Sequence, residues 1–315
     1  MLLPQAYQRM LLIRNFEETI EELFLEGRVM GTAHTCIGQE ALSVGVAAAL
    51  EPVDAMTTTH RGHGHFLARG ADPARAMAEL FGKSIGYSKG RGGSQMMMDP
   101  AIGFYGANGI TGGSIPFATG IALDAVMRKS GRVTVCMFGD GASNQGVFHE
   151  SLNLAALWKL PVLYVIENNG YAMSTSTARG LANPCTADRA LALKVPGVSI
   201  NGNDFEEVRN CIAHYATAAR QGNGPAVIEC VTYRLSGHSR GDPRVYRSRE
   251  EEEQAWQNDP INLFEQKLIS TQVLTVEQAE QIKKESAQQI KQAVQTCEKA
   301  PDASMTEFEN SLFAQ

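Results

Sequence analysis

Two nearly continuous apolar runs, residues 133–138 and 161–166, constrain the fold of this chain more than any other feature. An apolar run without polar alternation is typical of a strand buried on both faces, as the strands of parallel sheets are. Residues 145–158, between the two runs, have a helical pattern, and a further helix over 204–221 leads into a third apolar strand at 226–231. This alternation of strand and helix predicts an α/β fold with a doubly wound, mostly parallel sheet and helices on both of its faces.

The N-terminal part of the chain combines predicted helices with a long glycine-rich stretch. The apolar spacing predicts a helix over residues 5–26, a second helix over 39–50 and a short strand over 54–59. Residues 82–113 contain many glycines and few periodic apolar residues. A loop of that length inside a compact chain is more often functional than idle, so we expect it to serve the function of the protein.

The C-terminal part begins with residues 234–250, which are rich in Gly, Arg and Asp and lack an apolar period, so we expect an exposed, mobile loop. The chain then becomes polar and helical, and Thr275 and Gln278 are placed to cap a final helix. The apolar face of this helix is formed by Ile290, Ala293, Val294 and Cys297. We expect one α/β domain over residues 1–250 and a helical extension over 251–315 that packs on the same domain.

Composition excludes several classes of function. The chain has 28 basic and 34 acidic residues and a net charge of −6, which removes a general electrostatic reason to bind nucleic acid. No apolar run approaches the roughly 18–20 residues that a membrane helix needs, and charged residues interrupt the apolar N-terminus, unlike a signal peptide. The six cysteines are scattered without paired metal spacing. We therefore expect a cytoplasmic protein that binds neither membrane nor nucleic acid.

The polar residues that follow the two apolar runs predict a metal and phosphate site. Gly139-Asp140-Gly141 follows the first run and Asn168-Asn169 follows the second, with 26 residues between the two motifs. Adjacent parallel strands end at the same edge of a sheet, so the side chains of Asp140 and Asn169 can converge there. A carboxylate and an amide oxygen suit a hard cation such as Mg²⁺, which keeps its other positions for phosphate and water. The glycines let the backbone approach phosphates, and the following helix N-terminus favours negative charge.

These residues resemble a known family. Gly139-Asp140-Gly141 with Asn168-Asn169 looks like the thiamine diphosphate motif, and the surrounding GDGASNQGVFHESLNLAALWKLPVLYVIENNGYAMST resembles the alpha subunit of the thiamine-dependent dehydrogenase component of 2-oxo acid and acetoin dehydrogenase complexes. The resemblance extends from about residue 34 to 250 through the blocks HTCIGQEA (34–41), THRGHGHFLARG (59–70), GKSIGYSKGRGGS (82–94), GANGITGGSIPFATGIAL (106–123) and YRLSGHSRGDPRVYRSREE (233–251). It implies the thiamine diphosphate-binding fold, with thiamine diphosphate and Mg²⁺ as cofactors.

The resemblance also implies roles for individual residues. The metal ligands of the family fall on Asp140, Asn169 and the backbone carbonyl of Tyr171. The diphosphate contacts of the family fall on Arg61, Gly141, Ala142 and His238. The backbone that holds the aminopyrimidine falls on Gly109 and Thr111, with Ile110 between them. In the family the 233–250 loop closes over the cofactor, so its arginines at 240, 244, 247 and 249 are either a solvated face or groups that the diphosphate orders.

The histidines admit more than one interpretation. His60, His63 and His65 could suggest zinc, but no cysteine or carboxylate in their segment completes a ligand set, and Arg61 would repel a cation. The better interpretation pairs the Arg61 guanidinium with diphosphate, with His60 as a second donor. We expect His34, His63 and His238 to act near the reacting centre. For the remaining histidines, His65, His149 and His214, we expect structural roles.

A group that thiamine chemistry needs is missing from these blocks. A carboxylic acid must stand beside the aminopyrimidine ring so that the imino form can remove the thiazolium proton. In the family that Glu belongs to a separate beta subunit. We therefore expect this chain to be inactive alone, and to form a heterotetramer of two alpha and two beta chains that passes its acyl fragment to a lipoyl-bearing acyltransferase.

The substrate is the least constrained of these expectations. His60 resembles the acetoin-cleaving branch of the family, because the pyruvate branch usually has Tyr there. Met96 and Ser236 depart from the family pattern and remove a polar or cationic group near the channel, which allows an altered or larger substrate. Ser239 matches a phosphorylation site of mitochondrial members. The alternatives are a pyruvate or other 2-oxo acid dehydrogenase subunit and a biosynthetic carboligase; a non-catalytic regulator has no positive support.

Overall fold

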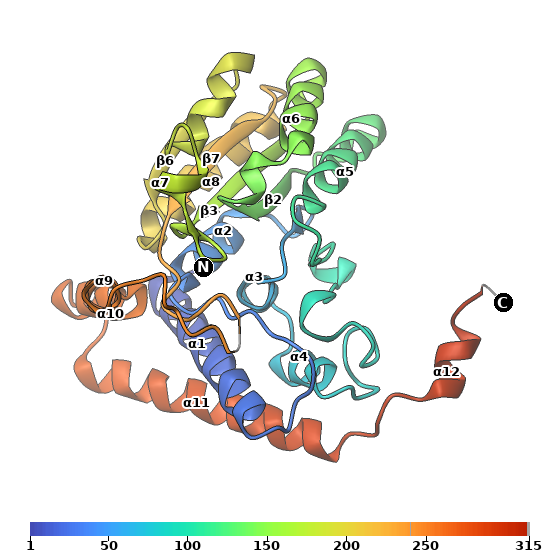
Figure 1. Ribbon diagram of the computed structural model, residues 1–315, viewed down its shortest axis with the longest axis vertical. Coiled ribbons are helices and arrows are strands. Elements are labelled where there is room, and N and C mark those ends of the chain that lie inside the picture. The colour runs from blue at the N-terminus through green and yellow to red at the C-terminus, as the bar shows by residue number, and fades with distance from the viewer. Residues whose placement is uncertain (240, 314–315) are drawn as a thin grey trace.

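A five-stranded, wholly parallel sheet forms the centre of the chain in a computed structural model that describes residues 1–239 and 241–313 (Figure 1). The strand order is β1-β2-β3-β7-β6. The strands are β1 (Ala55–Thr57), β2 (Thr134–Gly139), β3 (Val162–Asn168), β6 (Gly197–Asn201) and β7 (Ala226–Val231), with a separate two-stranded hairpin of β4 (Tyr171–Ala172) and β5 (Thr175–Ser176). The predicted parallel sheet is confirmed.

Helices surround this sheet and continue beyond it. The α-helices are α1 (Leu3–Leu25), α2 (Glu40–Ala49), α3 (His63–Ala68), α4 (Pro73–Leu80), α5 (Ser114–Arg128), α6 (Gly146–Trp158), α7 (Thr177–Gly180), α8 (Phe205–Arg220), α9 (Arg249–Gln257), α10 (Pro260–Ser270), α11 (Val276–Lys299) and α12 (Met305–Asn310). The 3₁₀ segments are η1 (Gly93–Gln95), η2 (Pro100–Ile102), η3 (Ala142–Asn144) and η4 (Thr186–Leu193).

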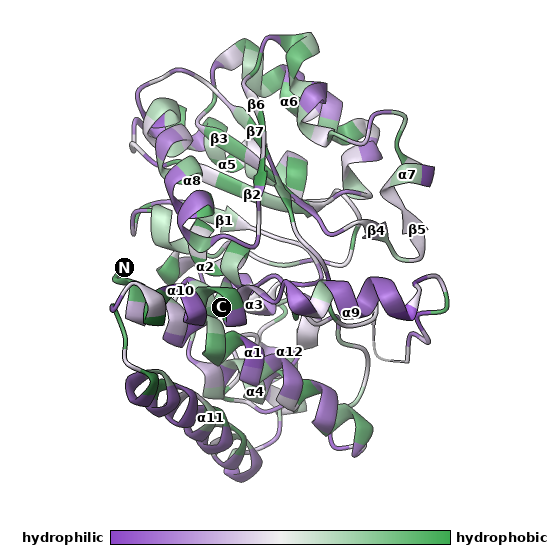
Figure 2. Cartoon of the chain, turned by 90° about the vertical axis from the view of Figure 1, so that its left-hand side faces the viewer, coloured by the Kyte–Doolittle hydropathy of each residue, from purple (hydrophilic) through white to green (hydrophobic). Residues whose placement is uncertain are grey.

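Each central strand is apolar throughout because the sheet has a hydrophobic core on both faces. Side chains alternate across a strand, so Val135 and Met137 of β2 join the core with α1, α2 and α8, whereas Cys136 and Phe138 join the core with α5 and α6. The apolar colour of the strands is visible in Figure 2, where α11 is mostly polar. Helices on both faces confirm the doubly wound architecture.

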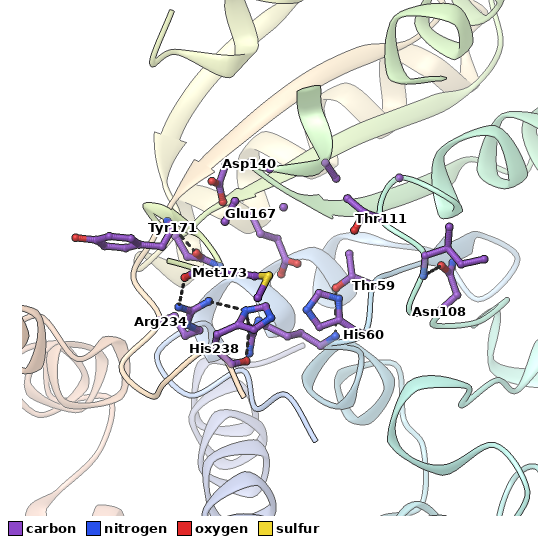
Figure 3. A pocket seen from close by; sticks show the side chains of 18 residues that line it. Thr59, His60, Asn108, Thr111, Asp140, Glu167, Tyr171, Met173, Arg234 and His238 are labelled. Carbon is purple, nitrogen blue, oxygen red and sulfur yellow. Dashed lines mark hydrogen bonds between the residues drawn. The ribbon is translucent and has the colours of Figure 1, made fainter. Parts of the chain in front are cut away.

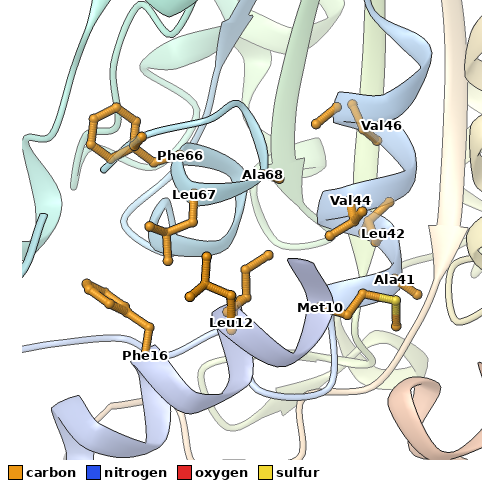
Figure 4. Close-up of a cluster of buried hydrophobic side chains, with 14 of the residues drawn as sticks. Met10, Leu12, Phe16, Ala41, Leu42, Val44, Val46, Phe66, Leu67 and Ala68 are labelled. Atoms are coloured by element: carbon orange, nitrogen blue, oxygen red, sulfur yellow. The ribbon is translucent and has the colours of Figure 1, made fainter. Parts of the chain in front are cut away.

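Helices α1, α2 and α3 pack together through buried apolar side chains, including those of Leu12, Phe16, Val44 and Phe66 (Figure 4). A buried ionic cluster also joins α1 to two other helices. The Arg14 guanidinium donates to Glu40 of α2 at 2.7 Å and to both carboxylate oxygens of Asp259, the residue that caps α10. The segment before α2 is therefore held by packing and by charge.

Several local expectations need correction. The 82–113 stretch is irregular as expected but contains the turns η1 and η2. The 234–250 loop is partly buried rather than exposed, because Arg247 donates to the backbone carbonyls of Arg234 and Ser236. Helix α11 has the predicted capping box of Thr275 and Gln278, but it is not the final helix, since α12 follows it. The predicted arginine at position 240 lies outside the described residues.

The C-terminal helices lie against the N-terminal part of the chain. Helix α11 packs on α1 and α4, and α12 lies near the C-terminus at the edge of the molecule (Figure 1), where the Arg91 guanidinium lies over the Phe308 ring. In the described residues, none of the helices combines the length and the apolar character that crossing a bilayer requires.

Candidate active site

The C-terminal ends of β2 and β3 bring together the two polar clusters of the sequence. Gly139 of β2 is in register with Glu167 of β3, so the residues that follow each strand emerge side by side. Asp140 and Asn169 are both buried and line the same cavity. Burial raises the pKa of Asp140 to about 6, since removing a carboxylate from water disfavours its charged form.

The cavity has a volume of about 270 Å³ and is shown in Figure 3. It lies between the C-terminal edge of the sheet and the loops after β1, before α5 and after β7. Its lining is formed by Thr59, His60, Arg61, Asn108, Ile110, Thr111, Gly112, Gly139, Asp140, Gly141, Ala142, Glu167, Asn169, Tyr171, Ala172, Met173, Arg234 and His238.

The turn after β2 requires a residue without a side chain at one position. A Cβ atom on Gly141 would lie 2.6 Å from the Cβ of Ala172 in the β4–β5 hairpin. The hairpin that carries Tyr171 therefore closes directly on the Asp140 turn. This contact places the Tyr171 backbone beside the side chains of Asp140 and Asn169 in the cavity wall.

Two buried guanidinium groups form the opposite wall. Arg61 donates to the carbonyls of Thr35 and His238 at 2.7 Å each, and its Nη2 lies 3.1 Å from His238 Nδ1. Arg234 Nη1 lies 3.4 Å from the same ring nitrogen, and Arg234 Nη2 donates to the Tyr246 hydroxyl. Burial, followed by the charge of Arg234, lowers the pKa of Arg61 to about 9. Because both guanidinium groups can donate to Nδ1 of His238, its ring proton belongs on Nε2.

A cluster of three histidines adjoins this wall. The ring centroid of His34 lies 4.6 Å from that of His60 and 5.1 Å from that of His238. Burial and the charge of Arg61 lower the pKa of His34 to about 4, of His60 to about 3 and of His238 to about 4. The three rings are close enough to hold a metal ion, but the guanidinium 3.1 Å from His238 opposes a cation there. His63 and His65, the other two histidines of the His60 segment, lie instead beside Glu17 and Glu167.

The donor set fits a diphosphate with a divalent cation. Arg61 makes no ion pair within residues 1–239 and 241–313, and His60 Nε2 is buried without a hydrogen-bond partner there. An unneutralised guanidinium and an unused ring nitrogen beside one cavity suit the oxygens of an anion. Asp140, Asn169 and the Tyr171 backbone supply the hard oxygen ligands that Mg²⁺ prefers. Both halves of the expected cofactor site therefore face one cavity.

Most of the predicted site residues lie in this lining, and three do not. His60, Arg61, Thr111, Asp140, Gly141, Ala142, Asn169, Tyr171 and His238 line the cavity, whereas His34, His63 and Gly109 are outside the lining. His34 contacts the cavity wall through the rings of His60 and His238. His63 is buried at the start of α3, where its Nδ1 lies 2.8 Å from Glu17 and its Nε2 lies 2.9 Å from Ser94.

Three further lining residues carry chemistry that the sequence analysis did not assign. Arg234 supplies the second guanidinium, Glu167 supplies a buried carboxylate, and Met173 faces the cavity with an exposed side chain. Arg234 lies in one of the matching blocks, which was the available signal for it. Glu167 could have been found from its position two residues before Asn169, at the end of the same strand.

The residues expected to affect specificity and regulation lie at the edge of the site. Ser236 contacts the Thr35 hydroxyl at 2.8 Å, and Met96 is exposed. Ser239 lines a second hollow, which also includes Glu18, Glu21 and Trp256. None of the three lines the cavity itself.

The fold and the cavity agree with comparisons to known proteins. The sequence model of the dehydrogenase E1 component family matches residues 8–306 of this chain. This chain belongs to the dehydrogenase E1 component family.

Its relatives include two kinds of alpha subunit. The alpha subunit of acetoin:2,6-dichlorophenolindophenol oxidoreductase from Bacillus subtilis is 47% identical over 264 residues, 84% of this chain and 79% of the relative. The corresponding alpha subunit from Cupriavidus necator is 43% identical over 94% of this chain and 89% of the relative. The alpha subunit of the pyruvate dehydrogenase E1 component from Zymomonas mobilis is 43% identical over 95% of this chain and 85% of the relative.

Proposed function

We propose that this chain is the alpha subunit of a thiamine diphosphate- and Mg²⁺-dependent dehydrogenase component that cleaves acetoin, or a related 2-hydroxyketone or 2-oxo substrate, and passes the acyl fragment to a lipoyl carrier. The observation that carries the proposal is one cavity with oxygen ligands on one wall and buried guanidinium groups on the other. Asp140 and Asn169 provide the first wall, and Arg61 and Arg234 provide the second.

Different residues of the cavity hold the metal and the diphosphate of the cofactor in this proposal. Asp140, Asn169 and the Tyr171 carbonyl hold Mg²⁺, and Arg61 and His238 donate to the diphosphate. When bound, thiamine diphosphate supplies the electron sink for breaking the bond next to the substrate carbonyl. The cationic wall would fix the phosphate end of the cofactor.

The other end of the cofactor is assigned to the backbone around Thr111. Thr111 lines the cavity, and Gly109 follows the lining residue Asn108. A built Cβ at Gly109 would lie 2.6 Å from the side-chain oxygen of Gln95. The close approach of Gln95 therefore requires a residue without a side chain at position 109.

A beta subunit completes the site in this proposal. The lining contains two carboxylates, those of Asp140 and Glu167. Asp140 serves the metal, and Glu167 already accepts hydrogen bonds from His65 at 2.7 Å and from Gln39 at 3.4 Å. The carboxylic acid that activates the aminopyrimidine must therefore come from another chain. Two apolar lining residues, Ile110 and Met173, are 76% and 63% exposed, which supports a partner covering this side.

Two observations favour acetoin as the substrate. His60 lines the cavity at the position where the acetoin branch differs from the pyruvate branch, and acetoin oxidoreductase subunits are among the relatives. Pyruvate is the second candidate, because pyruvate dehydrogenase subunits align over nearly the whole chain. Acetoin releases acetaldehyde where pyruvate releases carbon dioxide, so a base must take the proton of the acetoin hydroxyl.

The experiment co-expresses the full chain with a beta-type subunit and supplies thiamine diphosphate and Mg²⁺. Acetoin and pyruvate are offered separately with an artificial electron acceptor, and the chain without the beta-type subunit is the control. The proposal predicts acceptor reduction with acetoin, none with the chain alone, and little with pyruvate. Reduction with pyruvate alone would select the 2-oxo acid alternative. Carbon–carbon ligation with an added aldehyde, without any oxidation, would select a carboligase.

A further inference from the structure

A buried glutamine bridges a predicted metal ligand and a carboxylate at the end of β3. Gln39, which immediately precedes α2, has no exposed surface. Its side-chain oxygen accepts from Asn169 Nδ2 at 3.3 Å, and its Nε2 donates to Glu167 Oε1 at 3.4 Å. The cavity that holds Asn169 and Glu167 does not include Gln39 in its lining. Gln39 therefore acts on the site through these two residues.

The chemistry of the bridge fixes which way each amide turns. A carboxylate can only accept hydrogen bonds, so Gln39 must present its NH₂ group to Glu167. Its oxygen then faces Asn169, which must in turn present its own NH₂ group to Gln39. This orientation leaves Asn169 Oδ1 free for the metal side, where it now accepts only a long 3.4 Å bond from the Tyr171 amide.

The far end of the chain of hydrogen bonds is anchored in α3. His65 Nε2 donates to the same Glu167 oxygen at 2.7 Å, and His65 Nδ1 has no hydrogen-bond partner within the described part of the chain. The ring proton therefore belongs on Nε2, where it points at the carboxylate. The Glu167 carboxylate is thus held as an acceptor. It cannot rotate away from Gln39 without losing its short hydrogen bond to His65.

The backbone of Gln39 is also tightly held. Gly38 has a φ of +96°, and a Cβ atom there would lie 2.5 Å from the Tyr233 carbonyl oxygen. The Gln39 amide donates to the Cys36 carbonyl at 2.9 Å, and the Gly38 amide donates to the Glu40 carboxylate. The glutamine side chain consequently extends from a fixed point toward the end of β3.

We propose that Gln39 is a positioning residue, which orients the Asn169 amide so that its oxygen rather than its nitrogen faces Mg²⁺. The inference rests on the proposed function, because it takes Asn169 as a ligand of the cofactor metal. An amide that turned its NH₂ group to the cation would replace an attractive contact with a repulsive one. Partners of this kind behind metal ligands typically change metal affinity by roughly tenfold to a hundredfold when they are removed.

The test is Gln39→Met, which keeps the length of the side chain but removes both hydrogen bonds. Mg²⁺ is titrated by calorimetry into the full chain, co-purified with a beta-type subunit and saturated with thiamine diphosphate. We expect the Mg²⁺ dissociation constant to rise roughly tenfold to a hundredfold. The matched control is Gln288→Met on the exposed side of α11, which should leave the dissociation constant unchanged. If Gln39→Met does not fold, as judged by thermal unfolding without ligands, Gln39→Asn replaces it, because its amide is too short to reach both partners.

A second background separates orientation from general structural support. Asn169→Asp offers an oxygen in either orientation, so Gln39→Met should cause no loss of Mg²⁺ affinity in that background. An equal loss in both backgrounds, or unchanged affinity in the single variant, would overturn the positioning role while leaving the metal site intact. Absence of Mg²⁺ and thiamine diphosphate binding to the unaltered protein would instead overturn the proposed function itself.

Discussion

Single side chains in the cavity carry positive charge that the folded chain does not neutralise. Arg61 is fully buried, and its hydrogen bonds go to backbone carbonyls rather than to a carboxylate. Arg234 is buried beside Arg61, and the charge of Arg234 further lowers the pKa of Arg61. Burying a guanidinium without a counterion costs free energy. An anion that binds between these groups supplies the missing counterion, so its binding is favoured.

Arg61→Ala tests this account of the cationic wall. Loss of a charged hydrogen bond should weaken thiamine diphosphate binding by about 1.5–3 kcal/mol, measured by calorimetry at saturating Mg²⁺. Arg128→Ala is the control, because Arg128 is exposed on α5 and pairs with the partly exposed Asp124. Lower turnover with unaltered cofactor affinity would assign Arg61 a different role.

The histidine cluster predicts a pH dependence of stability without cofactor. His34, His60 and His238 have pKa values of about 4, 3 and 4 in the folded chain, against roughly 6.5 when unfolded. Between pH 6.5 and 4 the unfolded state binds more protons, so the free energy of unfolding should fall as the pH falls through this window. Urea unfolding across the window should show a shallower fall for His60→Gln. The control His214→Gln removes an exposed histidine and should match the unaltered chain, whereas equal slopes for all three proteins would contradict the assignment.

Among the elements, α2 depends on an ionic cluster that also supports the segment preceding it. Arg14 of α1 joins Glu40 of α2 to Asp259 before α10, and all three side chains are buried. Glu40 also accepts from the Gly38 amide, next to Gln39. The packing of three helices is thereby coupled to the edge of the active site.

Arg14→Ala should destabilise the chain strongly, because it leaves two carboxylates buried without their partner. Removing one member of a buried pair costs about 3–5 kcal/mol, which chemical denaturation should detect as a lower free energy of unfolding. Arg28→Ala breaks exposed pairs with Glu26 and Glu298, so we expect a loss of about 1 kcal/mol or less. Similar losses for both variants would show that the buried cluster does not stabilise the helix packing.

The sequence predicted those elements whose own pattern of apolar residues indicates burial. β2, β3 and β7 were predicted because both faces of each strand are covered, which leaves few polar positions. The elements α3, α4, α5 and β6 are among those that were not predicted. Helix α3 is only six residues long and contains two histidines and a glycine, so it has no helical spacing of apolar residues. It is buried because elements distant in the sequence pack around it.

The same distinction applies to the site. Asp140 and Asn169 were paired from the sequence because each directly follows a recognisable strand. Gln39 and Arg234 approach them from segments far apart in the chain, so local spacing gave no sign of their contacts. His63 illustrates the reverse case, since its place in a matching block suggested a role at the reacting centre, whereas its contacts are Glu17 and Ser94.

The molecule as a whole places its cavity at the C-terminal edge of a parallel sheet, where ligands of open α/β sheets generally bind. The two hydrophobic cores bury β2 and β3 on both faces, and the loops around their ends supply the chemistry. The proposed function therefore requires that the ends of these two strands hold a cation against the diphosphate.

Calorimetric titration of thiamine diphosphate with and without Mg²⁺ tests that requirement most directly, using the complex of this chain with a beta-type subunit. Asp140→Ala is compared with Asp124→Ala, which alters a partly exposed carboxylate on α5. We predict that Mg²⁺ promotes binding to the unaltered complex and to Asp124→Ala, and that Asp140→Ala abolishes this Mg²⁺-dependent binding. The same Mg²⁺-dependent affinity in Asp140→Ala as in the unaltered complex would contradict the account.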